Sequence, residues 1–228
     1  MNPSIVQSCN KLVTSAMAQR YGYFQPMVAV VPAGEHGEAR VEHYIIDDSA
    51  SSFTRMRQAL NPGRDEFIPV GHYVRLFVRD ELVMTDTPME LRSNFSAVSG
   101  ARGDVLLGGL GIGLVALAVA QKPGVRSVTV IEKSADVVCL VEDAIRRQLS
   151  GLQSAGFVVF TADVRTWEPQ TRNIHRFDYT YLDIWPNICT DDYADHVALR
   201  RRYRRWASRP GGKVESWNFE YIAKKMKG

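Results

Sequence analysis

The sequence has little cysteine and almost no net charge. Its three cysteines are scattered and odd in number, which favours reduced thiols in a cytoplasmic protein over a disulfide framework. Neither these cysteines nor the five dispersed histidines have metal-ligand spacing, so no metal site is predicted. With 28 basic and 25 acidic residues, the net charge of +3 is too small to indicate a nucleic-acid partner by itself.

Long apolar runs are also missing. The longest, residues 105–120, is interrupted by glycines, so neither a membrane span nor a membrane partner is expected. The first nine residues have no basic start and no apolar stretch, so a secretory signal is not expected. A length of 228 residues with 45% hydrophobic and 23% charged residues suits one large α/β domain, or a domain of about 130 residues with an accessory region.

The sequence does contain a glycine-dense turn, the glycine loop (residues 108–113). An apolar run (105–107) precedes it, a helix is predicted over 114–121, and a second apolar run (128–131) ends on Glu132. Three glycines stand at alternate positions: Gly109, Gly111 and Gly113. Glycines let a ligand approach the backbone, and an acid at the next strand end can bind both hydroxyls of a ribose. The pattern predicts a site for an adenosine-containing cofactor. A plain tight turn followed by a solvated acid is the alternative.

The glycine spacing narrows the choice of cofactor. The dinucleotide pattern G-x-G-x-x-G would place a glycine where Leu114 stands. Further along, two apolar runs end on Asp163 and Asp183. The glycine spacing, Glu132 and these two acids, in this order, resemble the motifs of the class I S-adenosylmethionine-dependent methyltransferases over residues 100–220.

This resemblance implies a binding mode for S-adenosyl-L-methionine. The glycine loop would pass under the methionine and ribose, Glu132 would bind the ribose, and Asp163 would lie beside the adenine. Asp183 would stand at the catalytic rim. One position departs from the pattern, because Leu107 and Gly108 stand where many members carry an acid. The methionine ammonium would therefore need another partner.

The chain divides near residue 100. Residues 1–99 are expected to form a β-rich accessory region that covers the substrate or serves oligomerisation. Its apolar runs are typical of short strands: 27–31, 41–46, 73–78 and 82–84. The last two runs, joined through 79–81, predict a β-hairpin, and helices are predicted over 51–60 and, from the apolar spacing, within 1–25.

Residues 100–228 are expected to form the cofactor-binding domain. The order strand, helix, strand, helix, strand, strand, helix, strand, helix predicts an α/β fold with a Rossmann-like, doubly wound, mainly parallel sheet. Residues 136–149 are the predicted second crossover helix, and residues 213–217 the predicted fifth strand. The two final strands of a seven-stranded methyltransferase sheet are not expected, because few residues follow.

A narrower resemblance concerns the spermidine synthases, which carry a β-hairpin region before the same core. The predicted hairpin, residues 85–90 and the glycine loop follow one another in the same order here. Those enzymes transfer an aminopropyl group from decarboxylated cofactor to a polyamine. Two acidic features of that family are missing, because Ile112 stands at an aspartate position and residues 183–187 replace an aspartate-rich loop.

A second narrower resemblance concerns the guanidinoacetate-type N-methyltransferases. The segment Asp-Ile-Trp-Pro at residues 183–186 is similar to their Asp-x-Tyr-Pro, and residues 87–89 to their Thr-Pro segment. In that family the aspartate orients and deprotonates the substrate nitrogen. By this resemblance Asp183 would hold an acceptor amine or guanidine, and Trp185 could stack on a cation.

Several of these residues also have structural interpretations. Asp183 could cap a turn, Trp185 could fill a core, and Asp163 could be a helix N-cap. Asp86 and Glu90 could supply substrate carboxylates, or could belong to a helix start in which Asp86 or Thr87 is the N-cap. The second interpretation is favoured for this pair, although the two are compatible.

The strongest charge run is arginine-rich, residues 200–205. On a helix Arg201 and Arg205 would lie on neighbouring turns, and the interleaved Tyr203 and Trp206 could stack a base. Acids before the run and arginines at its end also suit the helix dipole without a partner. The solvated helix is the favoured interpretation over nucleic-acid binding.

These observations predict an S-adenosylmethionine-dependent methyltransferase that acts on a small nitrogen nucleophile. A spermidine synthase-like aminopropyltransferase is the main alternative. Cleavage of the cofactor without an acceptor, and a degenerate cofactor-fold scaffold that binds RNA, also stay open. The expected partner is a small-molecule acceptor, and the sequence leaves a homodimer open.

Overall fold

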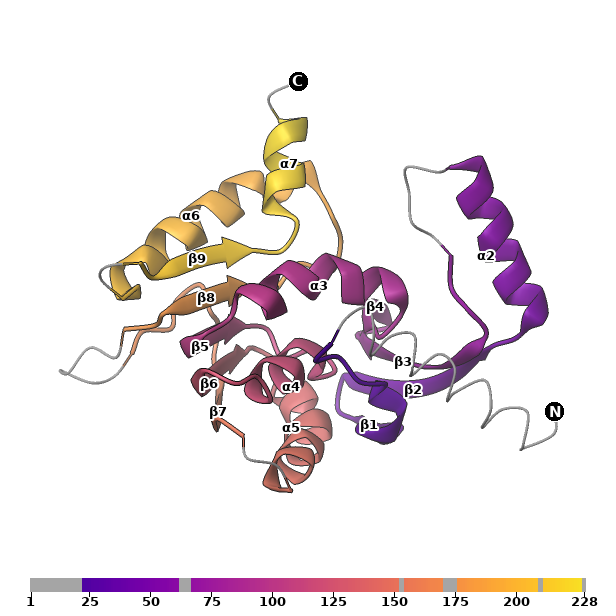
Figure 1. Cartoon of the computed structure of the whole chain (residues 1–228), viewed down its shortest axis with the longest axis horizontal. Coiled ribbons are helices and arrows are strands. Elements are labelled where there is room, and N and C mark those ends of the chain that lie inside the picture. The colour runs from indigo at the N-terminus through magenta and orange to yellow at the C-terminus, as the bar shows by residue number, and fades with distance from the viewer. Residues whose placement is uncertain (1–21, 62–66, 152–153, 170–175, 209–210, 227–228) are drawn as a thin grey trace.

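The computed structural model describes residues 22–61, 67–151, 154–169, 176–208 and 211–226. It contains a four-stranded antiparallel sheet with strand order β1-β2-β3-β4 and a five-stranded sheet with order β7-β6-β5-β8-β9, in which every pair of neighbours is parallel. Figure 1 shows the antiparallel sheet beside the glycine-loop end of the parallel sheet.

The antiparallel sheet confirms the hairpin and three of the four predicted strands, those over 41–46, 73–78 and 82–84. Its strands are β1 (Gly34–His36), β2 (Ala39–Ile46), β3 (Gly71–Val78) and β4 (Glu81–Thr85). Arg79 and Asp80 form the hairpin turn in the left-handed region, with φ of 51° and 60°, a geometry that matches the twist of paired strands. Helix α2 (Asp48–Leu60) confirms the predicted helix over 51–60.

The prediction of a strand over 27–31 is wrong. This segment forms a 3-10 helix, η1 (Met27–Ala29), in which the backbone N–H of Val31 donates to the carbonyl of Met27. Met27 and Val31 are both fully buried, so their four-residue spacing was a helical pattern rather than a strand pattern. The helical spacing noted within residues 1–25 lies almost entirely outside the described residues.

The parallel sheet and its helices follow the predicted order. The strands are β5 (Gly103–Gly108), β6 (Val125–Glu132), β7 (Gly156–Thr161), β8 (Tyr179–Leu182) and β9 (Lys213–Ser216). The helices are α3 (Pro88–Gly100), α4 (Leu114–Ala120), α5 (Ala135–Ser150), α6 (Tyr193–Tyr203) and α7 (Phe219–Lys225). Within the described residues no strand follows β9. The expected Rossmann-like parallel sheet is confirmed.

Both faces of the central strands β5 and β8 are buried, which explains their continuous apolar runs, whereas the edge strand β7 exposes Val158 and Phe160. Along β5, Val105 and Leu107 belong to the core cluster that contains α3, α4 and α5, whereas Leu106 belongs to the cluster that contains α6. Along β8, Tyr181 belongs to the first of these clusters and Leu182 to the second. This alternation places helices on both sides, so the sheet is doubly wound.

Strand order also decides where a ligand can bind. The chain places β6 and β7 on one side of β5, and β8 and β9 on the other. The carboxyl ends of β5, β6 and β8 therefore meet at the point where the order reverses, which is where ligands bind in open α/β sheets. In the part of the chain that the structure describes, no helix has the length and apolarity to cross a bilayer.

Candidate cofactor and acceptor site

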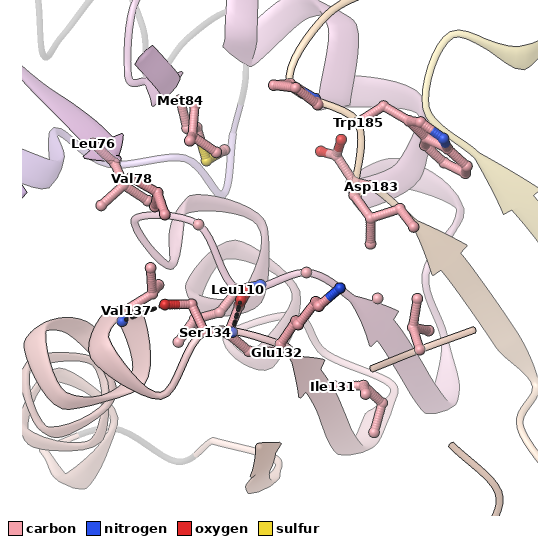
Figure 2. Close-up of a pocket in the computed structure, with 18 of the residues that line it drawn as sticks. Leu76, Val78, Met84, Leu110, Ile131, Glu132, Ser134, Val137, Asp183 and Trp185 are labelled. Atoms are coloured by element: carbon pink, nitrogen blue, oxygen red, sulfur yellow. Dashed lines mark hydrogen bonds between the residues drawn. The ribbon is translucent and has the colours of Figure 1, made fainter. Parts of the chain in front are cut away.

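A pocket of about 560 Å³ lies at this strand-order reversal, between the carboxyl ends of the parallel strands and the antiparallel sheet. This volume is typical of a small-molecule site. Figure 2 shows Leu76, Val78 and Met84 on one side of the pocket, opposite Asp183, with Glu132 at another edge. Leu76, Val78 and Met84 thus form an apolar wall that comes from the antiparallel sheet. Three charged residues of the same sheet and its turns, Glu38, Arg79 and Glu81, also line the pocket.

The glycine loop forms the floor of the pocket. At each of its three alternate glycines a different neighbouring group leaves no room for a side chain. All three have positive φ values, which favour glycine. A Cβ at Gly109 would strike the carbonyl oxygen of Asp183, and one at Gly111 would strike the Met84 sulfur. Gly113 does not line the pocket, and a Cβ there would strike Ile145 of α5. Gly113 thus serves helix packing, while Gly109 and Gly111 line the ligand side.

Glu132, the last residue of β6, is held by the loop that it faces. Its carboxylate accepts hydrogen bonds from the backbone N–H of Leu110 and of Ser134, both at 2.8 Å. Ser134 in turn is the N-cap of α5 and accepts from the N–H of Val137. Each carboxylate oxygen has a further lone pair, and the side chain lines the pocket. The arrangement fits a bidentate contact with two vicinal hydroxyls, as a ribose presents.

Asp163 also lines the pocket, but not at a strand end as expected. Strand β7 ends at Thr161, and Asp163 begins a turn by accepting from the N–H of Arg165 at 2.8 Å. No helix follows in residues 164–169, so the helix N-cap interpretation is wrong. Although partial burial opposes it, this bond and the Lys133 ammonium at 3.2 Å hold the pKa of Asp163 below its usual value.

Asp183 and Glu90 bring two carboxyl groups to one end of the pocket. Asp183 follows β8 directly, and its backbone N–H donates to the carbonyl of Gly108 at 2.8 Å. Glu90 comes from the first turn of α3 and lines the same pocket. Burial and the nearby Glu90 charge raise the pKa of Asp183 well above its usual value, and burial raises the pKa of Glu90 to about 7. A cation between them would relieve both effects.

Trp185 lines the pocket, yet most of its contacts belong to the core. Its indole N–H donates to Asp195 at 3.1 Å, and its ring stacks on His196 with centroids 3.5 Å apart. The side chain is buried in the smaller core cluster. This geometry favours the core interpretation of Trp185 over stacking on a substrate.

Asp86 lies outside the residues that line the pocket. Its two carboxylate oxygens accept from the backbone N–H of Met27 at 3.0 Å and of Val74 at 2.7 Å. Burial raises its pKa to about 6, despite these hydrogen bonds. Thr87 occupies the N-cap position of α3 without a side-chain capping bond, and Pro88 is the first helical residue. The structure therefore gives Asp86 an anchoring contact between η1 and β3, which neither sequence interpretation had anticipated.

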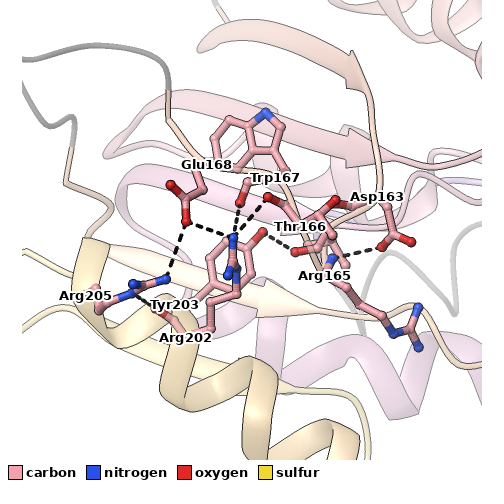
Figure 3. A network of polar contacts seen from close by, with 9 residues as sticks. Asp163, Arg165, Thr166, Trp167, Glu168, Arg202, Tyr203 and Arg205 are labelled. Atoms are coloured by element: carbon pink, nitrogen blue, oxygen red, sulfur yellow. Dashed lines mark hydrogen bonds and ion pairs between the residues drawn. The ribbon is translucent and has the colours of Figure 1, made fainter.

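The arginine run is largely occupied within the chain (Figure 3). Arg202 donates to the carbonyls of Thr166 and Trp167 and to Glu168, at 3.0 to 3.2 Å. Arg205 lies 3.6 Å from Glu168 and sits in a 3-10 turn, because α6 ends at Tyr203. These contacts tie α6 to the segment after β7 and favour a structural use of the run.

Sequence reasoning missed the apolar wall and Trp217, which also lines the pocket. Leu76, Val78 and Met84 read in the sequence as ordinary strand residues, and no local signal marks them as ligand-facing. In the part of the chain that the structure describes, no group of three or more metal-ligating side chains could hold a metal ion.

Comparisons with known proteins complete this picture. No family model and no curated protein matches the sequence. The structure is similar to the CcbJ methyltransferase of Streptomyces caelestis, at 21% identity and a TM-score of 0.39, over 54% of this chain and 45% of that one. It is also similar to an S-adenosylmethionine-dependent methyltransferase of Clostridium acetobutylicum, at 15% identity and a TM-score of 0.37. The match covers 54% of this chain and 46% of that one. A third structure, precorrin 8W decarboxylase of Methanobacterium thermoautotrophicum, gives 19% identity and a TM-score of 0.43, over 64% and 72%.

The chain thus spans less than half the length of the two methyltransferase structures that it matches.

Proposed function

We propose that this chain is a class I S-adenosylmethionine-dependent methyltransferase that acts on a small nitrogen nucleophile. The observation that carries the proposal is the meeting of Glu132, the glycine loop and Asp183 in one pocket. Glu132 would hold the ribose of the cofactor, and Asp163 would lie beside the adenine. Asp183 would hold the acceptor nitrogen at the other end.

When bound, S-adenosylmethionine supplies a methyl group activated by its sulfonium centre. The protein then has to align an acceptor nitrogen with that carbon and take up a proton. Asp183 suits both tasks, because the hydrogen bond to Gly108 fixes its backbone beside the glycine loop. Burial and the nearby Glu90 charge raise the pKa of Asp183, which makes its carboxylate a stronger base toward the proton of the acceptor nitrogen. Gly109 keeps the loop in contact with Asp183, since any side chain there would displace it.

Aminopropyl transfer is a second candidate function, and the position of Glu90 in the pocket supports it. A polyamine acceptor needs several carboxylates, and Glu90, which the sequence analysis named as a candidate substrate carboxylate, lines the same pocket as Asp183. The two candidates differ in the cofactor that they require, because aminopropyl transfer uses the decarboxylated form.

Calorimetric titration tests the proposal and separates the candidates. The protein is titrated with S-adenosylmethionine, S-adenosylhomocysteine and decarboxylated S-adenosylmethionine. The Glu132→Gln variant keeps an acceptor for one loop amide but loses the carboxylate charge. We expect its affinity for the ligand that the unchanged protein binds to fall at least about tenfold, equivalent to about 1.4 kcal/mol. Glu142→Gln on α5, where the carboxylate pairs with Arg146 and does not line the pocket, is the matched control and should bind these ligands as the unchanged protein does.

Each outcome has a definite meaning. Binding of the first two ligands, weakened only in Glu132→Gln, supports methyl transfer and justifies an acceptor screen with Asp183→Asn as control. Preference for the decarboxylated ligand supports aminopropyl transfer instead. Absence of binding by all three overturns both candidates and leaves the scaffold or RNA-binding alternative. Product formation without an acceptor would indicate cofactor cleavage.

A further inference from the structure

The glycine loop lacks the acid that many class I methyltransferases carry at its start. Leu107 and Gly108 stand at that position, and neither has a side chain that can bind the ammonium group of a methionine moiety. Leu107 is buried in the core cluster that contains residues of α3 and α4. A cofactor that lies along this loop therefore needs a carboxylate from another element.

Helix α3 brings such a carboxylate to the same face of the sheet. Leu91, next to Glu90 in the first turn of α3, belongs to the core cluster that contains Leu107 and Tyr181. Tyr181 of β8 pairs with Leu107 of β5, and its hydroxyl donates to the Asn94 side chain at 2.9 Å. The Asn94 amide in turn donates to the backbone carbonyl of Glu90 at 3.1 Å. These contacts hold Glu90 beside the carboxyl end of β5, where the glycine loop begins.

The Glu90 carboxylate is free to take a ligand, unlike two other acids of the pocket. Its hydrogen bond from the Asn94 amide is long, at 3.5 Å, so its oxygens keep lone pairs for a donor. By contrast, Glu132 accepts from two backbone N–H groups, and Asp163 pairs with Lys133. Burial raises the pKa of Glu90 to about 7, and a bound cation would lower that pKa again.

We propose that Glu90 binds the ammonium group of the methionine moiety, in place of the acid that the glycine loop lacks. This assignment rests on the proposed function, because it requires S-adenosylmethionine in the pocket. Glu132 then binds the ribose, while Glu90 binds the ammonium near the start of the loop. Because Glu90 is committed to the cofactor, Asp183 is left as the carboxylate for the acceptor. This arrangement fits an acceptor with a single amine or guanidine group better than a polyamine.

Removal of the amino group from the ligand tests the assignment on the unchanged protein. Calorimetry compares S-adenosylhomocysteine with its deaminated analogue, in which hydrogen replaces the amino group and the carboxylate is kept. We expect the analogue to bind at least about tenfold more weakly, because it lacks the charged donor. Equal affinity for the two ligands would show that the protein does not recognise the ammonium, and would overturn the assignment.

The Glu90→Gln variant then identifies the carboxylate. It keeps the size of the side chain and should bind S-adenosylhomocysteine at least about tenfold more weakly, while its affinity for the deaminated analogue stays unchanged. Glu132→Gln is the matched comparison, because both ligands contain the ribose and should lose affinity equally in that variant. Glu142→Gln, outside the pocket, should bind both ligands as the unchanged protein does. Circular dichroism establishes that each variant is folded before titration.

The outcomes separate this assignment from the proposed function. Absence of binding of S-adenosylhomocysteine and S-adenosylmethionine by the unchanged protein overturns the proposed function, and the role of Glu90 with it. Binding with a Glu90→Gln effect that is absent, or equal for the two ligands, keeps the cofactor site and overturns only the role of Glu90. A loss of affinity confined to S-adenosylhomocysteine supports the assignment.

Discussion

The raised pKa of Glu90 makes a quantitative prediction about stability. Burial at the acidic end of the pocket raises this pKa from 4.5 to about 7. Between these two values the folded chain binds a proton that the unfolded chain releases. The contribution of Glu90 to the unfolding free energy therefore falls as pH rises from 4.5 to 7, and it is fully lost above 7. The difference of about 2.5 between the two pKa values corresponds to about 3.4 kcal/mol.

The Glu90→Gln variant removes this dependence, because an amide does not ionise. At pH 5 the unfolded chain of the unchanged protein is already partly ionised at this position, so part of the difference is present there. We therefore expect the advantage of Glu90→Gln over the unchanged protein to grow by about 2–3 kcal/mol between pH 5 and pH 8.5.

Urea unfolding at a series of pH values measures this difference. The other titrating groups contribute to both proteins and cancel to first order in the comparison. Glu35→Gln, at a carboxylate that is 73% exposed, is the control and should show little change over the same pH range. A Glu90→Gln advantage that is constant from pH 5 to 8.5 would show that Glu90 ionises at its ordinary value, and would refute the buried acidic pair.

Three further predictions concern residues whose neighbours the structure identifies. Gly109→Ala forces a side chain into the backbone of Asp183 at a φ of 101°. We expect the unfolding free energy measured in urea to fall by about 2–4 kcal/mol, and calorimetric cofactor binding to be lost. Gly151→Ala is the control and should be nearly neutral, because nothing lies within 4 Å of a Cβ at that position. Asp86→Ala leaves two buried N–H groups without acceptors and should lower the unfolding free energy by about 2–5 kcal/mol. The folded protein should still bind the cofactor. Loss of cofactor binding with unchanged stability would contradict the anchoring interpretation. Arg202→Ala should lower the unfolding free energy by about 1–2 kcal/mol, and Arg201→Ala should lower it by less than about 0.5 kcal/mol. Equal losses in the two variants would argue against the contacts in Figure 3.

Predictions from the sequence succeeded where a local pattern carries the information. The glycine loop has positive φ values that glycine adopts without strain, so the three alternate glycines mark it in the sequence without the rest of the chain. The alternation of strands and helices after residue 100 follows from apolar runs and helical spacing within each segment. The strand predicted over 27–31 failed because a short apolar run fits a buried helical turn equally well, and the choice depended on burial.

The sequence by itself thus determined the Rossmann-like order of elements, the glycine loop and the acid that closes β6, because each depends on neighbours within a few residues. The tertiary structure alone decided how distant residues meet. Glu90 joins Asp183 across 93 positions only because α3 leads into β5 beside β8, and Asp86 reaches the N–H of Met27 across 59. Such contacts leave no local trace, since the chain closure that forms them depends on the packing of the whole sheet. The same reason explains why the apolar wall of the pocket became visible only in three dimensions.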